Sequence, residues 1–185
     1  MAVKIVDRDN PVLRQVAKEI PVSDITKPRI KETIKKMKEV LDAEEDGVGL
    51  AAPQIGVSLR IFIISEKAFD LSEDIHQRRE ELRKSKTVKT GNLVFINPRI
   101  VKISKETHFM EEGCLSVRWA YGRIKRSKKT TVEAYDEDGK KFTRGASGLV
   151  AEIFQHEMDH LEGKLFIDSA TDIREMPPER NLKTY

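Results

Sequence analysis

The chain has 185 residues, of which 38% are hydrophobic and 35% charged, and its formal net charge is +3. This length suits one domain, here expected over residues 1–185, because two domains would each be small for an independent core. Basic and acidic residues alternate along most of the chain, so we expect neither specific nucleic-acid binding nor an anionic membrane as a partner.

Cys114 is the only cysteine, so no internal disulfide can form, which suits a reducing compartment. Residues 1–10 carry charges where a signal peptide needs an apolar run. No apolar stretch approaches the roughly 20 residues needed to cross a bilayer. We therefore expect a cytoplasmic protein.

The first third of the chain predicts two helices and a strand. Asn10-Pro11 suits a helix start, because Asn caps free amides and Pro is tolerated in the first turn. A longer helix is expected after Pro28. Its apolar side is formed by Ile30, Ile34, Met37 and Leu41. The β-branched run at residues 59–64 predicts a buried strand.

The central part is densely charged from about residue 66 to 91, which indicates a surface insertion, with a helical turn around residues 74–84. Strands are predicted at three further places. These are residues 93–96, 99–103 and 130–135. Asp138-Gly139 suits a hairpin turn that leads to a last strand at residues 140–143.

A final helix is predicted at residues 149–161, entered through Gly145 and Gly148 and ended by Gly163, before a short tail at residues 168–185. The order of helices, then strands, then one late helix indicates an α+β fold and not an alternating one. We expect mostly antiparallel sheets packed around this C-terminal core helix.

The final helix contains the sequence His156-Glu157-Met158-Asp159-His160. Residues four apart lie on one face of a helix, so both imidazoles can reach one metal ion. Glu157 lies beside them, where a carboxylate can handle the proton of a water on the metal. The apolar neighbours of this segment favour a core helix over a chance match on a surface helix.

A hydrolytic metal site usually has three protein ligands and one open position. Cys114 is the leading candidate for the third ligand, since it is the only thiol and follows a glycine. A lone cysteine is also often a small buried hydrophobe, and His76 and His108 are rival ligands. The residue types alone leave this choice open.

Residues 47–56 read GVGLAAPQIG, and such small residues let a backbone approach a ligand closely. Gln54 offers an uncharged donor for an oxygen that becomes negative during hydrolysis. A tight turn packed against the core explains the glycines equally well.

Together, three segments resemble the motifs of the peptide deformylase family, which are G-x-G-L-A-A-x-Q-I-G, E-G-C-L-S and Q-H-E-x-D-H-L. This chain reads GVGLAAPQIG at 47–56, EGCLS at 112–116 and QHEMDHLEG at 155–163, in the family's order. The resemblance covers roughly residues 5 to 167. It implies metal-dependent removal of the formyl group from the N-terminal formylmethionine of newly synthesised polypeptides, with release of formate. Transient proximity to the ribosome is a further expectation.

The resemblance makes Cys114, His156 and His160 the ligands of one divalent metal ion. It implies Fe²⁺ in the cell, although a thiolate and two imidazoles also suit Zn²⁺, Ni²⁺ or Co²⁺. Metal-bound water would be the nucleophile and Glu157 the general acid/base.

Gln54 and the backbone amide of Leu115 would hold the formyl oxygen. The substrate peptide would pair with the protein backbone as an added strand, and its methionine side chain would enter a pocket. The residues implied for substrate binding are Val48, Gly49, Gly113, Leu149 and Ile153.

The chain departs from the family pattern in three places, one of which is the insertion at residues 66–91, longer than in the short bacterial forms. Arg118 replaces a proline, so the loop through Trp119 and Tyr121 is expected to run differently. Glu152 stands where a pocket-facing apolar residue is common, and because a buried unpaired carboxylate is costly, we expect it at a polar rim. Arg126 matches a family arginine that pairs with the motif glutamate, here Glu112.

Two other functions are weighed against deformylation. A metallopeptidase of the H-E-x-x-H type would take its third ligand downstream. The candidates there are Glu162, Asp168, Glu175 and Glu179. A non-catalytic, zinc-stabilised binding module would close its site with four ligands, and the sequence supplies three convincing ones. Cys114 together with Gln54 favours deformylation.

Overall fold

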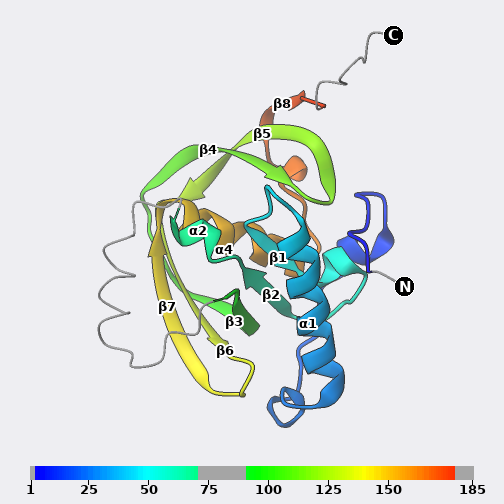
Figure 1. Ribbon diagram of the computed structural model, residues 1–185. Helices are drawn as coiled ribbons and strands as arrows, with labels where there is room; N and C mark the ends of the chain where they lie inside the picture. Colours follow the sequence, from blue (N-terminus) through cyan, green and yellow to red (C-terminus); the bar gives the residue numbers. More distant parts are fainter. Residues whose placement is uncertain (1–2, 71–90, 178–185) are drawn as a thin grey trace, which may run out of the picture.

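The computed structural model describes residues 3–70 and 91–177, which form two antiparallel sheets (Figure 1). The five-stranded sheet has the order β1 (Gly49–Ala51), β2 (Ile61–Ile64), β3 (Leu93–Ile103), β6 (Lys129–Tyr135) and β7 (Lys141–Ser147). The three-stranded sheet has the order β4 (Thr107–Cys114), β5 (Val117–Ser127) and β8 (Thr171–Glu175). Neighbouring strands in both sheets are antiparallel, so the predicted α+β fold is confirmed.

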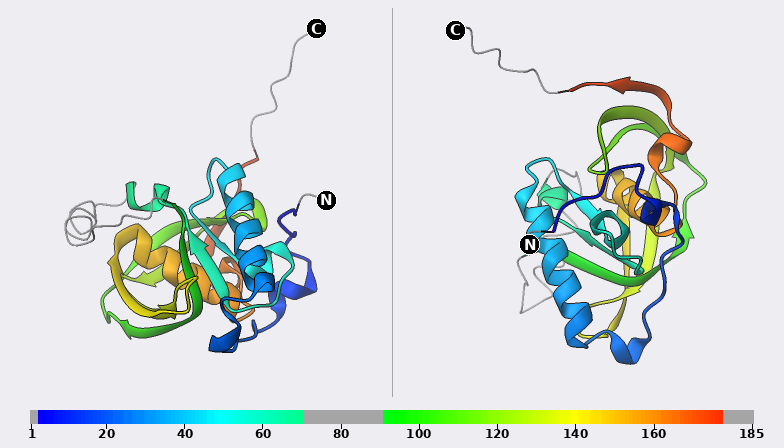
Figure 2. Two further views of the ribbon diagram at one scale, coloured as in Figure 1. Left: turned by 60° about the horizontal axis from the view of Figure 1, so that its bottom comes forward. Right: turned by 90° about the vertical axis from the view of Figure 1, so that its right-hand side faces the viewer.

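Two helices, α1 (Pro28–Ala43) and α4 (Gly148–Leu161), cover opposite faces of the five-stranded sheet. On β2, Phe62 and Ile64 pack in the cluster that contains α4, while Ile61 and Ile63 pack in the cluster that contains α1. Successive side chains of a strand point to opposite faces, so covering both faces explains why this strand is apolar throughout. Figure 2 shows α1 along the outside of the molecule.

Helix α4 lies in the interior, and ten of its 14 residues are buried (Figure 1). The three-stranded sheet covers the side of α4 that faces away from the five-stranded sheet, through side-chain contacts from β4 and β5. Short elements complete the described part of the chain. They are η1 (Pro11–Arg14), η2 (Val22–Asp24), η3 (Ala52–Ile55), α2 (Lys67–Asp70) and η4 (Phe166–Asp168). None of the helices in these described ranges is long and apolar enough to cross a membrane.

The N-terminal region follows the prediction in part. Helix α1 is confirmed, with its four expected apolar residues buried. The side chain of Asn10 accepts a hydrogen bond from the Val12 amide at 3.1 Å, but only a single 3₁₀ turn follows. The chain then extends because the Ala17 amide donates to the carbonyl of Leu161, at the end of α4, over 2.8 Å. Tertiary pairing therefore replaces the longer helix that the sequence predicts.

Several strand predictions need correction. The two strands expected at 93–96 and 99–103 are one strand, β3, with an irregularity at Asn97, whose φ is +49°. Gly145 lies within β7 and does not begin the last helix. Strands β4, β5 and β8 were not predicted, and β8 forms part of the segment expected to be a tail.

The expected start of the charged surface insertion, at about residue 66, is wrong. Ala68 is fully buried and Phe69 is 7% exposed, so the start of this segment belongs to the core and not to the surface. The helical turn expected at residues 74–84 lies outside the described residues.

The end of α4 depends on Gly163, which has φ +72° and donates its amide hydrogen to the carbonyl of His160 over 3.2 Å. A Cβ atom at this position would lie 2.8 Å from the carbonyl oxygen of Arg14. Glycine is thus required both for its conformation and for the close approach of the N-terminal segment.

We expect Gly163→Ala to lower the free energy of unfolding by at least about 2 kcal/mol, because backbone strain adds to the contact with Arg14. Urea denaturation measures this loss. Gly139→Ala is the matched control, since Gly139 also has a positive φ, +77°, but a Cβ there meets nothing within 4 Å. Its loss should be about 1 kcal/mol. Equal losses in the two variants would contradict the role of the close approach.

Candidate active site

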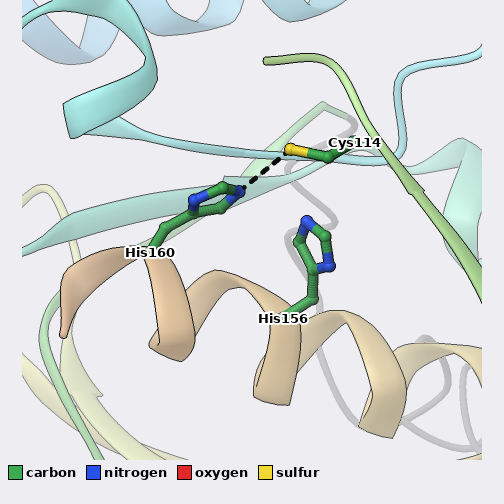
Figure 3. Close-up of side chains that lie close together, drawn as sticks. All are labelled: Cys114, His156 and His160. Carbon is green, nitrogen blue, oxygen red and sulfur yellow. Dashed lines mark hydrogen bonds between the residues drawn. The ribbon is translucent and has the colours of Figure 1, made fainter. Parts of the chain in front are cut away.

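The side chains of Cys114, His156 and His160 lie close together. Helix α4 presents the two histidines from successive turns, and Cys114 reaches them from the end of β4 (Figure 3). Their candidate ligand atoms all lie within 4.8 Å of one another, with Cys114 Sγ 3.2 Å from His160 Nε2. Of the rival ligands, His108 is not part of this group, and His76 lies outside the described residues.

A chain of buried charges holds His156 in place. The ring nitrogen Nδ1 of His156 lies 2.9 Å from Glu112 Oε2. Arg126 donates to both oxygens of Glu112, over 2.6 and 2.9 Å, and its third nitrogen donates to Asp159 over 2.7 Å. The expected pairing of Arg126 with Glu112 is confirmed, whereas the role of Asp159 was missed. Its position three residues after His156, on the same side of the helix, was the available signal.

The charges of this chain agree with its geometry. Burial raises the pKa of Glu112, but the hydrogen bonds from Arg126 and His156 outweigh burial and lower that pKa to about 2. Glu112 is therefore ionised and accepts from Nδ1 of His156, which leaves Nε2 to face Cys114. Such a carboxylate partner is typical of a histidine that binds a metal.

The donor set fits a divalent transition metal. Burial raises the pKa of the Cys114 thiol, but the neighbouring His160 and His156 outweigh burial and hold that pKa well below its ordinary value. The thiolate is the form of cysteine that binds a metal. One thiolate and two imidazoles within reach of a common point leave room for a further ligand.

Gln54 lies beside this group and is 2% exposed. Its Oε1 accepts from the amide of Ala51 over 2.8 Å, so Nε2 points the other way. Nε2 lies 3.5 Å from Cys114 Sγ and 3.4 Å from Ser116 Oγ. An uncharged donor is thus fixed next to the cysteine. Sequence reasoning missed Ser116, although it is the last residue of the EGCLS motif.

Glu157 is 3% exposed and approaches the backbone of β1 very closely. A Cβ atom on Gly49 would lie 2.5 Å from Glu157 Oε1, so only glycine fits opposite this carboxylate. Burial raises the pKa of Glu157 to about 7, although His156 and His160 act to lower it. Glu157 Oε2 has no hydrogen-bond partner among the described residues.

A cavity of about 270 Å³ opens beside these groups. Gln54, Cys114, His156 and Glu157 contribute to its wall. All five residues expected to bind substrate also line it, namely Val48, Gly49, Gly113, Leu149 and Ile153. The three motifs, far apart in the sequence, therefore meet around one space.

Two expectations about the cavity are wrong. Glu152 is 8% exposed and lines the cavity, so it does not lie at an exposed rim. The segment after Cys114 is not a loop, because Arg118 and Tyr121 belong to strand β5. Arg118, which stands where the family pattern has a proline, pairs with Glu44 and Asp46 ahead of β1. Arg118 and Asp46 both line the cavity.

We expect Arg126→Met to lower the free energy of unfolding by about 3–5 kcal/mol, because it leaves Glu112 buried without its cation. The matched control is Arg123→Met on the same strand. The Arg123 side chain is 53% exposed and 3.8 Å from Asp172, so its loss should stay within about 1 kcal/mol. Chemical denaturation of both variants measures the difference. Similar losses in the two variants would show that Arg126 does not stabilise the buried carboxylate of Glu112.

Comparison with known proteins shows the family to which this chain belongs. The family model for polypeptide deformylase matches residues 2–176. A peptide deformylase of Flavobacterium psychrophilum is 38% identical, over 99% of this chain and 90% of that protein. The crystal structure of the Thermotoga maritima peptide deformylase aligns with a TM-score of 0.73 at 34% identity, over 92% of this chain and 99% of that one.

A further solved structure contains a peptide. The Met-Ala-Ser-bound class I type b peptide deformylase of Acinetobacter baumannii aligns with a TM-score of 0.74 at 27% identity, over 91% of this chain and 99% of that one. The match to the family model extends over nearly all of the described residues, and it includes all three motifs. The chain therefore belongs to the polypeptide deformylase family of metal-dependent hydrolases.

Proposed function

We propose that this chain hydrolyses the N-formyl group of formylmethionyl nascent peptides and releases formate. The observation that carries this proposal is the meeting of Cys114, His156 and His160 with Gln54 and Glu157 around one cavity. The Acinetobacter baumannii neighbour holds Met-Ala-Ser, which is the kind of peptide that deformylation leaves behind. We place this reaction in the cytoplasm, the compartment in which formylated chains are made.

Cys114, His156 and His160 would hold one divalent metal ion, and we propose Fe²⁺, with Zn²⁺, Ni²⁺ or Co²⁺ as alternatives that the same ligands accept. When bound, such an ion polarises a carbonyl group and lowers the pKa of water towards about 7. Glu112 and Arg126 keep the His156 ring in the orientation that metal binding requires.

Glu157 and Gln54 have different roles in the reaction: Glu157 transfers the proton, and Gln54 donates to the formyl oxygen. The carboxylate of Glu157 takes a proton from the attacking water and delivers it to the leaving amine nitrogen. A group with a pKa near neutrality is suited to both halves of this transfer, and the pKa of Glu157 is raised to about 7. Gln54 Nε2 and the amide of Leu115 donate to the formyl oxygen as negative charge develops on it.

The cavity explains why a formyl group is the target. A formyl carbon carries only hydrogen, so a tight site admits it and excludes larger acyl groups. The backbone at Val48 and Gly113 would pair with the peptide, and this requires no particular side chains downstream. Leu149 and Ile153 would contact the methionine side chain. Such a site accepts many different nascent chains. We expect it to act on them close to the ribosome.

The function is tested on protein purified without oxygen, with its metal content measured. We expect it to release formate from formyl-Met-Ala-Ser and to leave acetyl-Met-Ala-Ser intact. Peptide cleavage without formate release would favour a metallopeptidase, and metal binding with no turnover would favour a binding module. Either result would overturn the proposal.

We expect Cys114→Ala to lose the stoichiometric metal ion, because two imidazoles remain and the thiolate is gone. Elemental analysis of the purified variant measures this. Ser116→Ala is the matched control, since Ser116 contacts Gln54 but is not among the grouped ligands, and it should keep the metal. Full metal content in Cys114→Ala would remove this residue from the ligand set.

We expect Glu157→Gln to keep its metal and fold but to lose about 10²–10⁴-fold in kcat, since an amide cannot move the proton. The matched control is Glu162→Gln, at the end of the same helix, where Glu162 pairs with Arg60. It should keep both metal and activity. A metallopeptidase with Glu162 as third ligand would instead lose its metal in that control. An active Glu157→Gln would refute the mechanism.

A further inference from the structure

One carboxyl group in the cavity has no role in the proposed reaction. Glu152 lies one helical turn before His156 and three residues after Leu149, so helix geometry places all three on the same side of α4. It lines the cavity and is 8% exposed. Its Oε2 is buried and makes no hydrogen bond within residues 3–70 and 91–177.

The other acidic side chains of the cavity wall are accounted for. Glu112 pairs with Arg126, and Asp46 pairs with Arg118. Glu111, also on the wall, has Arg174 at 2.6 Å. Glu157 is assigned to proton transfer. Among the acidic side chains of this wall, Glu152 therefore has no ion-pair partner in the described part of the chain and no role in the proposed reaction.

We propose that Glu152 makes the pocket for the first side chain of the substrate a hydrogen-bond acceptor, so that, besides formylmethionyl peptides, the enzyme processes formylated peptides whose first side chain ends in a donor, above all an ammonium group. The proposal rests on the proposed function and widens its substrate class. A buried carboxyl group without a partner is costly, and a ligand that supplies a donor removes that cost. A purely apolar side chain leaves the cost in place.

The remaining wall of the pocket suits a side chain with an apolar stem and a polar end. Leu149 and Ile153, on the same side of α4, can contact the methylene groups, while Glu152 receives the terminal donor. Burial raises the pKa of Glu152 to about 7, and the charge of Glu112 acts in the same direction. The raised pKa is consistent with a carboxyl group that lacks a partner until a substrate arrives.

The test compares formyl-Xaa-Ala-Ser peptides in which Xaa is ornithine or norleucine. The two side chains have the same length and differ only in a terminal ammonium or methyl group, and formyl-Met-Ala-Ser is the reference. At pH 8 we expect the ratio of kcat/KM for ornithine over norleucine to fall by about 10²-fold in Glu152→Leu. Glu152→Gln keeps the volume and an acceptor oxygen but not the charge, so its ratio should fall by about tenfold.

Glu32→Leu is the matched control, because it removes one glutamate from the surface of α1, where the side chain is 65% exposed and does not line the cavity. Its ratio should equal that of the parent. Metal content and circular dichroism are measured for every variant, and Glu152→Gln decides the result if Glu152→Leu fails to fold. An unchanged ratio in folded, metal-loaded variants that still hydrolyse formyl-Met-Ala-Ser would overturn this inference alone. No hydrolysis of any formyl peptide by the metal-loaded parent would overturn the proposed function itself.

Discussion

The burial of helix α4 is the constraint on which the rest of the structure depends. A helix covered on both sides by sheets must find partners for every polar group that it carries, because unpaired polar groups are costly away from water. The chain of contacts from His156 through Glu112 and Arg126 to Asp159 meets this need for His156 and Asp159, and it begins and ends on α4. It also ties the three-stranded sheet to the helix, so the same contacts hold the fold together and orient the candidate ligand.

Sequence patterns predicted what depends on local periodicity. Helix α1 and the apolar side of α4 follow directly from residue spacing. Strands β4 and β5 were missed because many of their residues are exposed or only partly buried, while the apolar partners of their buried residues come from distant elements. Val117 and Ile124 pack against Leu13 and Phe166, which no local window contains. Register across such distant segments is what brings Cys114 to the histidines, and it is not encoded in any one motif.

The error at Glu152 has a different origin. The rule that an unpaired carboxylate avoids burial predicted Glu152 at an exposed rim. The helical spacing between Glu152 and His156 instead places both side chains on the same side of α4, toward the cavity. Glu157 Oε2 and His160 Nδ1 are likewise buried without partners in the described part of the chain. Unsatisfied groups in native proteins are few, and two of them, on Glu152 and Glu157, belong to residues that line the same cavity. This is expected of a site whose partners are supplied by a ligand. General rules of stability are therefore least reliable where the chemistry is located.

The arrangement of strands has a mechanical consequence. In the described residues β1 and β4 are the outer strands of two separate sheets, and the cavity lies between Gly49 on one and Gly113 on the other. An extended peptide that pairs with both edges would act as a missing strand and join the two sheets into one continuous surface. The nascent chain would then connect the two sheets for as long as it stays bound. The protein would be most rigid while it holds its substrate and would loosen again when the peptide departs.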